Sequence, residues 1–340
     1  MNIVLVMPPY DYAAALGSRR KMKRGQLPPL GVGCIAACLD PEQHDVRFID
    51  AGAMGLSIEE TVQAIVEHAP RVVGISAMTR SRDSAYALAE ALKRERPQTT
   101  IVLGGPHATS FCEGALGECE AIDVLVPGEG EIVFPTLVDA LEKGVSLADV
   151  QGIIYRGEDG QPAFTPPAPV VQDLDTLPLP ARHLYRDDLY IPLPNQCRHT
   201  PATTVITSRG CPWGKCRFCY QGGRYSARYR RRSPENVIGE IRELVQEKGI
   251  REIVFWDDNF CVNPKWIDTF CNLLDAEPYR INWSAYGRAD TVTQAMLERM
   301  AASGCYNVYF GVESGCPELL ELVRKGITLE QVRSGIAWAK

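Results

Sequence analysis

Strand-like runs alternate with helix-like segments along the first 145 residues, and this alternation restricts the fold more than any other feature. The run Ile3–Met7 is apolar throughout and stops at Pro8-Pro9, as expected for a parallel strand buried on both faces. Further strand-like runs follow at 45–49, 72–76, 101–103 and 124–126, and helical segments lie between and after them at 31–39, 58–68, 84–95 and 132–142. This order predicts a doubly wound, Rossmann-like α/β domain over residues 1–145.

Residues 146–200 have a different composition and are interpreted as a connector. A short hairpin is expected over 153–156 and 162–164, with Gly160 in its turn. Many prolines follow as far as Pro194. That composition favours an extended segment that lies over domain surfaces and forms no core of its own.

The alternation resumes in residues 201–340. Strands are expected at 203–207, 252–256, 281–286 and 308–311, with helices at 234–248, 264–274, 292–302, 318–323 and 329–340. Thr328 and Gln331 have the spacing of a capping box at the start of the last helix. Four strand–helix units are too few to close a barrel, so a partial (βα) barrel is expected. Its inner face should then expose apolar residues such as Trp283 and Tyr309.

Charge and cysteine usage exclude several classes of protein. The net charge of −6 argues against a general nucleic-acid binder. Two basic runs, 19–24 and 224–232, are interpreted as solvated loops, with an anionic ligand as the alternative. The twelve cysteines fit free thiols in a reducing cytoplasm. The sequence contains no charged leader before its first apolar run and no apolar stretch of about 20 residues, so neither a signal peptide nor a membrane span is expected.

Three cysteines, Cys211, Cys216 and Cys219, lie on one short loop directly after the strand expected at 203–207. Three thiolates so placed can hold three irons of a cubane cluster and leave the fourth iron open for chemistry. The alternative is a zinc site with Cys197 or His199 as the fourth ligand. Zinc sites favour paired CxxC spacings, which this loop does not have.

Residues 209–219 resemble the cluster loop of the radical S-adenosylmethionine (SAM) superfamily, including the aromatic Phe218 before the last cysteine. Four residues separate the first two cysteines here, where the superfamily usually has three. The resemblance implies that the three cysteines hold a [4Fe-4S] cluster and that SAM binds its open iron. It also implies cleavage of SAM to a 5′-deoxyadenosyl radical, fed by a one-electron donor such as flavodoxin or ferredoxin.

Polar residues at the ends of the next three expected strands are candidates for SAM binding, since barrel sites gather at carboxyl ends. By the resemblance, Asp257 or Asp258 would accept hydrogen bonds from the ammonium group of SAM. Arg288 would pair with the carboxylate of SAM. Glu313 and Ser314 would reach the ribose hydroxyls or the amino acid moiety. The alternatives are a helix-capping turn for the aspartates and a surface position for Arg288.

The first domain resembles the cobalamin-binding domain that precedes the barrel in one branch of the superfamily. The resemblance lies in PPLG at 28–31, GGPH at 104–107 and GEGE at 128–131. No DxHxxG is present, which implies cobalamin without a protein histidine below cobalt. The residues assigned to cobalamin are Pro9, Tyr10, Ser76, Met78, Thr79, Gly104, Gly105, His107, Gly128, Glu129 and Gly130. The alternative is a flavodoxin-like domain without a cofactor.

Together these resemblances imply a cobalamin-dependent radical SAM C-methyltransferase in secondary or cofactor metabolism, acting on a small molecule or a peptide. A cyclase or rearrangement enzyme of the same branch is the alternative. The radical SAM core usually has six strand–helix units, so a truncated, non-catalytic cobalamin- or cluster-binding protein also stays open.

Overall fold

The computed structural model describes residues 1–10, 27–193, 196–220 and 228–340. The basic run 19–24 therefore lies outside the described residues. The chain divides into two compact units, Met1–Val171 with Pro178–Ile191, and Gln172–Leu177 with Pro192–Lys340. Each unit is described by itself.

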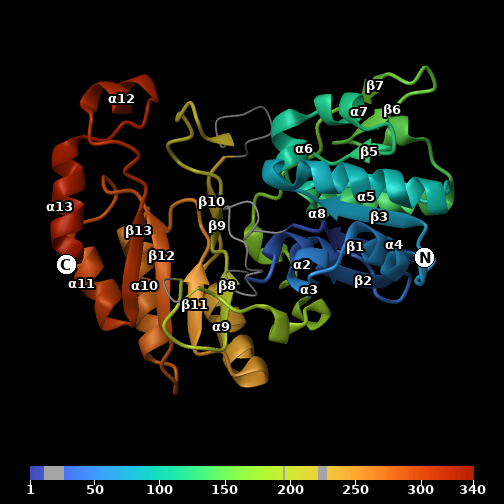
Figure 1. Ribbon diagram of the computed structural model, residues 1–340. Coiled ribbons are helices and arrows are strands. Elements are labelled where there is room, and N and C mark those ends of the chain that lie inside the picture. The colour runs from blue at the N-terminus through green and yellow to red at the C-terminus, as the bar shows by residue number, and fades with distance from the viewer. Residues whose placement is uncertain (11–26, 194–195, 221–227) are drawn as a thin grey trace. The chain divides into compact units, whose positions relative to one another are not determined.

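The first unit contains one sheet in the strand order β2-β1-β3-β4-β5-β6-β7 (Figure 1). The five predicted parallel strands are confirmed as β1 (Asn2–Met7), β2 (Asp45–Asp50), β3 (Val72–Ser76), β4 (Thr100–Gly104) and β5 (Val124–Leu125). The order 2-1-3-4-5 is that of flavodoxin-like sheets, in which ligands bind where the strand order reverses. Here that point lies at the carboxyl ends of β1 and β3.

Helices cover both faces of this sheet, as the apolar strands predict. Ile3 and Leu5 of β1 face a core shared with α2 (Leu30–Ala37) and α8 (Gly130–Lys143). Val4 and Val6 face the opposite core, shared with α4 (Ile58–Val66) and α5 (Arg82–Glu95). Successive residues of one strand thus contribute to different cores, which explains why the run is apolar throughout.

Three features of the first unit were not predicted. The hairpin expected in the connector forms as β6 (Ile154–Arg156) and β7 (Pro162–Phe164), and β6 pairs antiparallel with β5, so the hairpin extends the first sheet. Two short helices, α6 (Gly105–Phe111) and α7 (Gly114–Glu118), follow β4. A third, α3 (Ala51–Met54), follows β2. Each of these short helices has a glycine among its first two residues, and such a sequence is more typical of a loop, so the helices were not predicted.

The rest of the connector is more ordered than an extended segment. It contains short 3₁₀ turns, η3 (Leu174–Thr176), η4 (Arg182–Leu184) and η5 (Asp187–Leu189). The Tyr185 hydroxyl donates to the carbonyl of Pro29 at 3.0 Å, and Ala181 N–H donates to the carbonyl of Gly33 at 3.0 Å. A Cβ on Gly33 would lie 2.1 Å from the Tyr185 hydroxyl, so only glycine lets this segment dock on α2.

The second unit contains a parallel sheet in the order β13-β12-β11-β8. Its strands are β8 (Ala202–Val205), β11 (Glu252–Phe255), β12 (Asn282–Gly287) and β13 (Cys305–Phe310). Its helices are α9 (Pro234–Lys248), α10 (Pro264–Asp275), α11 (Gln294–Ala302), α12 (Pro317–Leu322) and α13 (Leu329–Ala339). All four predicted strands are confirmed, although β13 begins at Cys305 and not at Val308. The capping box of Thr328 and Gln331 is also confirmed.

The prediction that Trp283 is exposed on the inner face is wrong. Its side chain is fully buried on the helical side of the sheet, where its indole N–H donates to the carbonyl of Ser303 at 3.0 Å. Tyr286 stacks on Tyr309 at 4.9 Å between ring centres, and both rings are partly exposed. The alternation of apolar residues along a strand does not reveal which set faces the helices.

The prediction of a solvated basic loop is wrong for the described part of 224–232. Arg230 and Arg231 form strand β10 (Arg230–Arg231), which pairs antiparallel with β9 (Ser208–Arg209). Arg232 is buried and forms an ion pair with Glu240 of α9. The Arg231 guanidinium lies 3.9 Å from the ring centre of Trp266. These cations therefore hold the start of the cysteine loop against the second sheet.

None of the helices in the described part of the chain combines the length and the apolar character needed to cross a membrane.

Candidate functional site

The cysteine loop begins directly after β8 and the two-residue strand β9, at the carboxyl end of the second sheet. Gly210 and Gly214 turn the chain with positive φ angles of 80° and 54°. The three loop cysteines are not in disulfides and have intermediate exposure, and Cys219 N–H donates to the carbonyl of Cys216 at 3.1 Å. Across the described residues, no three His, Cys, Asp or Glu side chains are gathered as a metal site. The fit to a cluster therefore rests on the donor set, three accessible thiols on one loop, which suits iron.

The structure does not favour the zinc alternative. Cys197 is buried, and burial raises the pKa of its thiol to about 11. Without metal, this environment favours the protonated thiol, and among the described residues Cys197 is not gathered with the loop cysteines as a metal site. The backbone N–H of His199 donates to Glu252 at 2.8 Å, which ties this segment to the start of β11.

Asp257 is buried at the end of β11 and turns inward toward the start of the cysteine loop. Its carboxylate accepts hydrogen bonds from the N–H of Thr207 at 3.1 Å and from the Thr207 hydroxyl at 2.8 Å, and also from the Ser208 hydroxyl. Burial raises the pKa of Asp257, while the nearby Arg231 guanidinium acts in the opposite direction. The capping-turn alternative is wrong, because Asn263 caps α10. Asp258, by contrast, is exposed.

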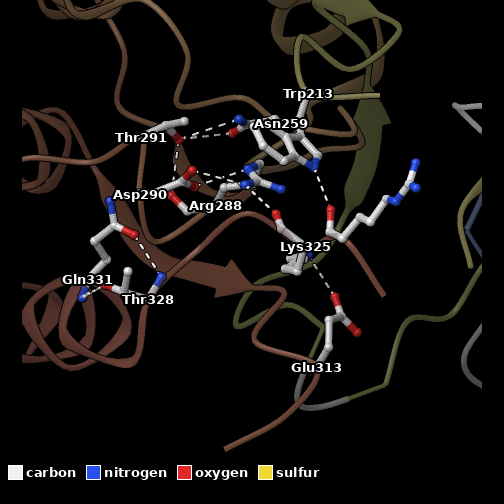
Figure 2. A network of polar contacts seen from close by, with 10 residues as sticks. Trp213, Asn259, Arg288, Asp290, Thr291, Glu313, Lys325, Thr328 and Gln331 are labelled. Carbon is white, nitrogen blue, oxygen red and sulfur yellow. Dashed lines mark hydrogen bonds and ion pairs between the residues drawn. The ribbon is translucent and has the colours of Figure 1, made fainter. Parts of the chain in front are cut away.

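Arg288, directly after β12, is buried and already engaged, so the alternative of a surface position is wrong. Its guanidinium forms a two-bond fork with Asp290 at 3.0 and 2.9 Å and also donates to the carbonyl of Lys325 at 2.9 Å. Thr291 links this group to the buried Asn259 through contacts of 3.4 Å (Figure 2). The fork that was expected to meet the SAM carboxylate is thus occupied by a carboxylate of the protein.

Glu313 and Ser314 follow β13 in an unusual backbone turn. Glu313 has a positive φ of 68°, and its carboxylate accepts a hydrogen bond from the ammonium of Lys325 at 2.8 Å (Figure 2). The Ser314 hydroxyl accepts a hydrogen bond from Cys316 N–H at 3.0 Å. Phe218 in the cysteine loop is 54% exposed. Glu313 and Phe218 are linked through Lys325, which also lies 5.7 Å from the Phe218 ring centre.

The sequence analysis missed Trp213, Lys325 and Gly326, all of which contact the cysteine loop or belong to it. One signal was available. A glycine shortly after a helix, as at Gly326 after α12, is typical of a turn with positive φ. The partner of that turn, Trp213, is far away in sequence, so no local pattern could have identified it.

The predicted cobalamin residues of the first unit gather at the carboxyl ends of its strands. Tyr10 follows β1, and the Arg80 guanidinium lies 5.6 Å from its ring centre. Met78, in the turn after β3, is 38% exposed. Ala77 N–H donates to the carbonyl of Gly104 at 3.1 Å, and His107 N–H donates to the carbonyl of Ala77 at 2.9 Å. The loops after β3 and β4 are therefore held together.

His107 is buried, and both of its ring nitrogens have contacts within the protein. Nε2 lies 2.8 Å from the Tyr86 hydroxyl and Nδ1 lies 3.4 Å from the Thr79 hydroxyl. Its ring stacks on Phe111 at 5.4 Å between ring centres. Burial lowers the pKa of His107, which favours the neutral imidazole. A ring held on both sides in this way suits a structural role in the loop.

The predicted glycines differ in what surrounds them. Gly105 has φ of 85°, and a Cβ there would lie 2.9 Å from the carbonyl oxygen of Ala77, so backbone geometry requires it. At Gly104, a Cβ would meet among the described residues only the carbonyl oxygen of Val126, at 3.9 Å, so this position is less crowded. Gly130 is the first residue of α8 and packs against Ile35, whereas Glu129 occupies the N-cap position of that helix. Gly128 N–H donates to the Thr109 hydroxyl at 3.0 Å, a link that sequence reasoning missed.

Comparisons with known proteins match both units. Residues 23–138 match the B12 binding domain, and residues 205–340 match the radical SAM superfamily. The uncharacterized methyltransferase PH0819 of Pyrococcus horikoshii is 37% identical over 340 residues, which cover 100% of this chain and 71% of the relative.

An anaerobic magnesium-protoporphyrin IX monomethyl ester cyclase of Rubrivivax gelatinosus is 30% identical, with 100% of this chain and 60% of the relative covered. Among solved structures, the cobalamin-dependent SAM radical enzyme OxsB, with aqua-cobalamin and SAM bound, matches with a TM-score of 0.82 at 21% identity. That match covers 99% of this chain and 47% of OxsB. The chain thus spans between about half and about 70% of these relatives.

Proposed function

Because the chain belongs to the family that joins a B12-binding domain to a radical SAM domain, we propose that it methylates a carbon atom of a small molecule or peptide. The observation that carries the proposal is that one chain contains both three accessible thiols after β8 and a flavodoxin-like sheet whose loops after β3 and β4 are held together by hydrogen bonds. The cofactors of this enzyme are a [4Fe-4S] cluster, SAM and cobalamin.

Within this proposal, Cys211, Cys216 and Cys219 hold the cluster. When bound, the cluster and SAM supply a carbon-centred radical, and cobalamin supplies a transferable methyl group. The protein residues bind and orient these groups. Asp257 holds the segment between β8 and the cysteine loop in place, because its carboxylate accepts hydrogen bonds from the hydroxyls of Thr207 and Ser208.

Asp258 is proposed to accept hydrogen bonds from the ammonium group of SAM, because it is exposed whereas Asp257 is buried. Glu313 and Ser314 are proposed to bind the ribose or the amino acid moiety, and exposed Phe218 to cover SAM from the cysteine loop. The engaged fork of Arg288 supports a different role from the one expected. We propose that it positions Asp290 and the backbone of Lys325.

For cobalamin, the proposed contacts are the loops after β1, β3, β4 and β5. The less crowded position of Gly104 permits a flat ligand to approach the backbone. His107 is proposed to hold the loop after β4 and not to ligate cobalt, since both ring nitrogens contact protein hydroxyls.

The substrate and the electron donor are proposed by class only. The substrate is a small molecule or a peptide, and the donor is a one-electron protein such as flavodoxin or ferredoxin. A reducing cytoplasm is proposed, because it suits this chemistry and twelve cysteines that are not joined in disulfides.

A second candidate is a cyclase or rearrangement enzyme, favoured by the 30% identity to the magnesium-protoporphyrin cyclase. The two candidates differ in their use of SAM. Methyl transfer converts SAM to S-adenosylhomocysteine as well as to 5′-deoxyadenosine, whereas cyclisation yields only 5′-deoxyadenosine.

The test is anaerobic reconstitution with iron, sulfide and cobalamin, followed by quantitation of both SAM products. We expect iron, cobalamin and S-adenosylhomocysteine in the wild type. The triple change of Cys211, Cys216 and Cys219 to alanine should abolish the brown absorbance and 5′-deoxyadenosine formation, whereas Cys38→Ala should change neither. Stoichiometric zinc without iron in the anaerobically purified protein would overturn the cluster assignment. Absence of S-adenosylhomocysteine would favour the cyclase.

A further inference from the structure

The turn Val323–Gly326, which follows α12, contacts the cysteine loop and the end of β12 through three successive backbone carbonyls. Arg217 N–H in the cysteine loop donates to the carbonyl of Val323 at 3.0 Å. The indole N–H of Trp213, in the same loop, donates to the carbonyl of Arg324 at 2.8 Å. Arg288 donates to the third carbonyl, that of Lys325, as described above. Figure 2 shows Trp213 and Arg288 converging on this turn.

Gly326 packs closely against the Trp213 ring of the cysteine loop. Its φ is 68°, a conformation that residues with a side chain rarely adopt. A Cβ at this position would lie 2.1 Å from an atom of the Trp213 ring, far inside van der Waals contact. Backbone conformation and close packing therefore both require glycine, and the Trp213 ring occupies the place of the missing side chain.

Lys325 connects the turn to the SAM candidates. Its side chain is 8% exposed and its ammonium lies 2.8 Å from a carboxylate oxygen of Glu313. The same ammonium lies 5.7 Å from the Phe218 ring centre, near the outer limit for a cation–π contact. One buried cation thus reaches from Glu313, the third residue after β13, to Phe218, the aromatic residue between the last two loop cysteines.

The turn depends on these contacts for its own position. The preceding helix α12 buries only Leu320, while Leu319 and Leu322 are 49% and 59% exposed. Directly after the turn, Ile327 is buried in the same apolar cluster as Leu320. Between these two anchors, the hydrogen bonds to Trp213, Arg217 and Arg288 fix the backbone of the turn.

We infer that the turn Val323–Gly326 is a clamp that positions the cysteine loop relative to Glu313, with Lys325 as a positioning residue for SAM. This inference rests on the proposed function for its SAM part, but the clamp itself is a property of the protein without cofactors. The clamp keeps the backbone around Cys216 and Cys219 ordered before any cluster is present, which lowers the entropic cost of gathering the three thiols.

Gly326→Ala tests the clamp, and Gly249→Ala is its matched control. Gly249 ends α9 with a φ of 61°, but its Cβ position has no atom within 4 Å. Both changes therefore impose the same backbone strain, and only one displaces Trp213. The measurement is hydrogen exchange of residues 212–219 in the apo chain, followed by mass spectrometry. We expect about tenfold faster exchange in Gly326→Ala and wild-type exchange in Gly249→Ala. Equal exchange in the two variants would overturn the clamp.

Trp213→Phe provides a milder variant that keeps an aromatic ring but removes the indole N–H. It should raise exchange at 212–219 less than Gly326→Ala does, and unchanged exchange would count against the clamp. If Gly326→Ala does not fold while Gly249→Ala does, the hydrogen exchange of Trp213→Phe alone decides whether the clamp exists.

Lys325→Met tests the positioning role. We expect wild-type iron content and an apparent Kd for SAM raised about tenfold or more, with Lys325→Arg restoring most of the affinity. A wild-type Kd in Lys325→Met would overturn that role. If the wild type binds no iron or SAM, the proposed function fails, whereas the exchange comparison still decides whether the clamp exists.

Discussion

The carboxylate of Asp257 accepts a hydrogen bond from the Thr207 hydroxyl at 2.8 Å, although the two residues lie fifty positions apart and follow different strands, β11 and β8. The pair joins the end of β11 to the residue that precedes β9 and the cysteine loop. The adjacent Asp258 is exposed. Neighbouring aspartates thus have different environments, one inside the protein and one facing solvent, and different roles are expected for them.

The first prediction separates these two aspartates. Asp257→Asn removes the buried charge, and whichever way the amide is turned, its NH2 group faces a hydrogen-bond donor of Thr207 or Ser208. We expect a loss of about 2–4 kcal/mol in the free energy of unfolding and reduced iron content after reconstitution. Asp258→Asn should change stability by less than about 0.5 kcal/mol but raise the KM for SAM about tenfold. Chemical denaturation and SAM-cleavage kinetics check the pair, and interchanged effects would show that the roles are reversed.

The second prediction concerns thiol reactivity in the apo chain. Burial raises the pKa of Cys197 to about 11 and that of Cys261 to about 12. At pH 8 both should resist iodoacetamide, whereas Cys211, Cys216 and Cys219 are exposed enough to react. Labelling of Cys197 should increase only as the pH approaches 11. Mass spectrometry of the labelled peptides checks this, and rapid labelling of Cys197 at pH 8 would revive it as a metal ligand.

The third prediction concerns His107. Its pKa is lowered by burial, so below about pH 6.5 the unfolded state binds a proton that the folded state resists. Stability from this group is therefore present above that pH and is lost as the pH falls through the folded pKa. The melting temperature of His107→Asn should drop less between pH 7 and pH 5 than that of the wild type, as measured by circular dichroism.

The same variant tests cobalt ligation. His107→Asn should bind cobalamin with unchanged stoichiometry, and electron paramagnetic resonance of the cob(II)alamin form should show no coupling to a protein nitrogen in either chain. Nitrogen coupling in the wild type that disappears in the variant would make His107 a cobalt ligand after all.

The fourth prediction uses two glycines of α2. Gly33→Ala would push a Cβ to within 2.1 Å of the Tyr185 hydroxyl, so we expect a loss of about 1–3 kcal/mol in the free energy of unfolding and detachment of the segment 178–191. Gly31→Ala meets no atom within 4 Å and should change stability by less than about 1 kcal/mol. Denaturation curves and proteolysis at 178–191 check both. Equal stability of the two variants would exclude docking through Gly33.

The sequence predicted the parallel strands of both units well, because buried strands such as β1 leave a long apolar signal between prolines and glycines. It failed where pairing is not local. The hairpin β6–β7 was predicted, but its pairing with β5 was not, since an edge strand carries no mark of its partner. Trp283 was assigned to the wrong face because an alternating pattern is symmetric with respect to the two faces.

In the candidate site, too, local features were predicted and long-range contacts were not. The three cysteines and the residues at the strand ends could be identified from the sequence, as they lie at predictable positions relative to strands. What each of these residues contacts could not. Asp257 and Arg288 turned out to be engaged inside the protein, and Lys325 was overlooked, because its contacts with Glu313 and Phe218 depend on a turn whose position is set by Trp213.

The segment between residues 171 and 192 has a consequence for how the chain can be divided. Residues 172–177 belong to the second unit, where Asp175 accepts from Ser233 N–H at 2.9 Å, and residues 178–191 return to the first unit through Tyr185. The chain therefore passes from one unit to the other three times. If the chain is cut once between residues 171 and 192, one of the two fragments carries a short segment that belongs to the other unit. A gene fusion that borrows the B12-binding unit intact must therefore carry residues up to 191 and accept a short orphaned stretch of its neighbour.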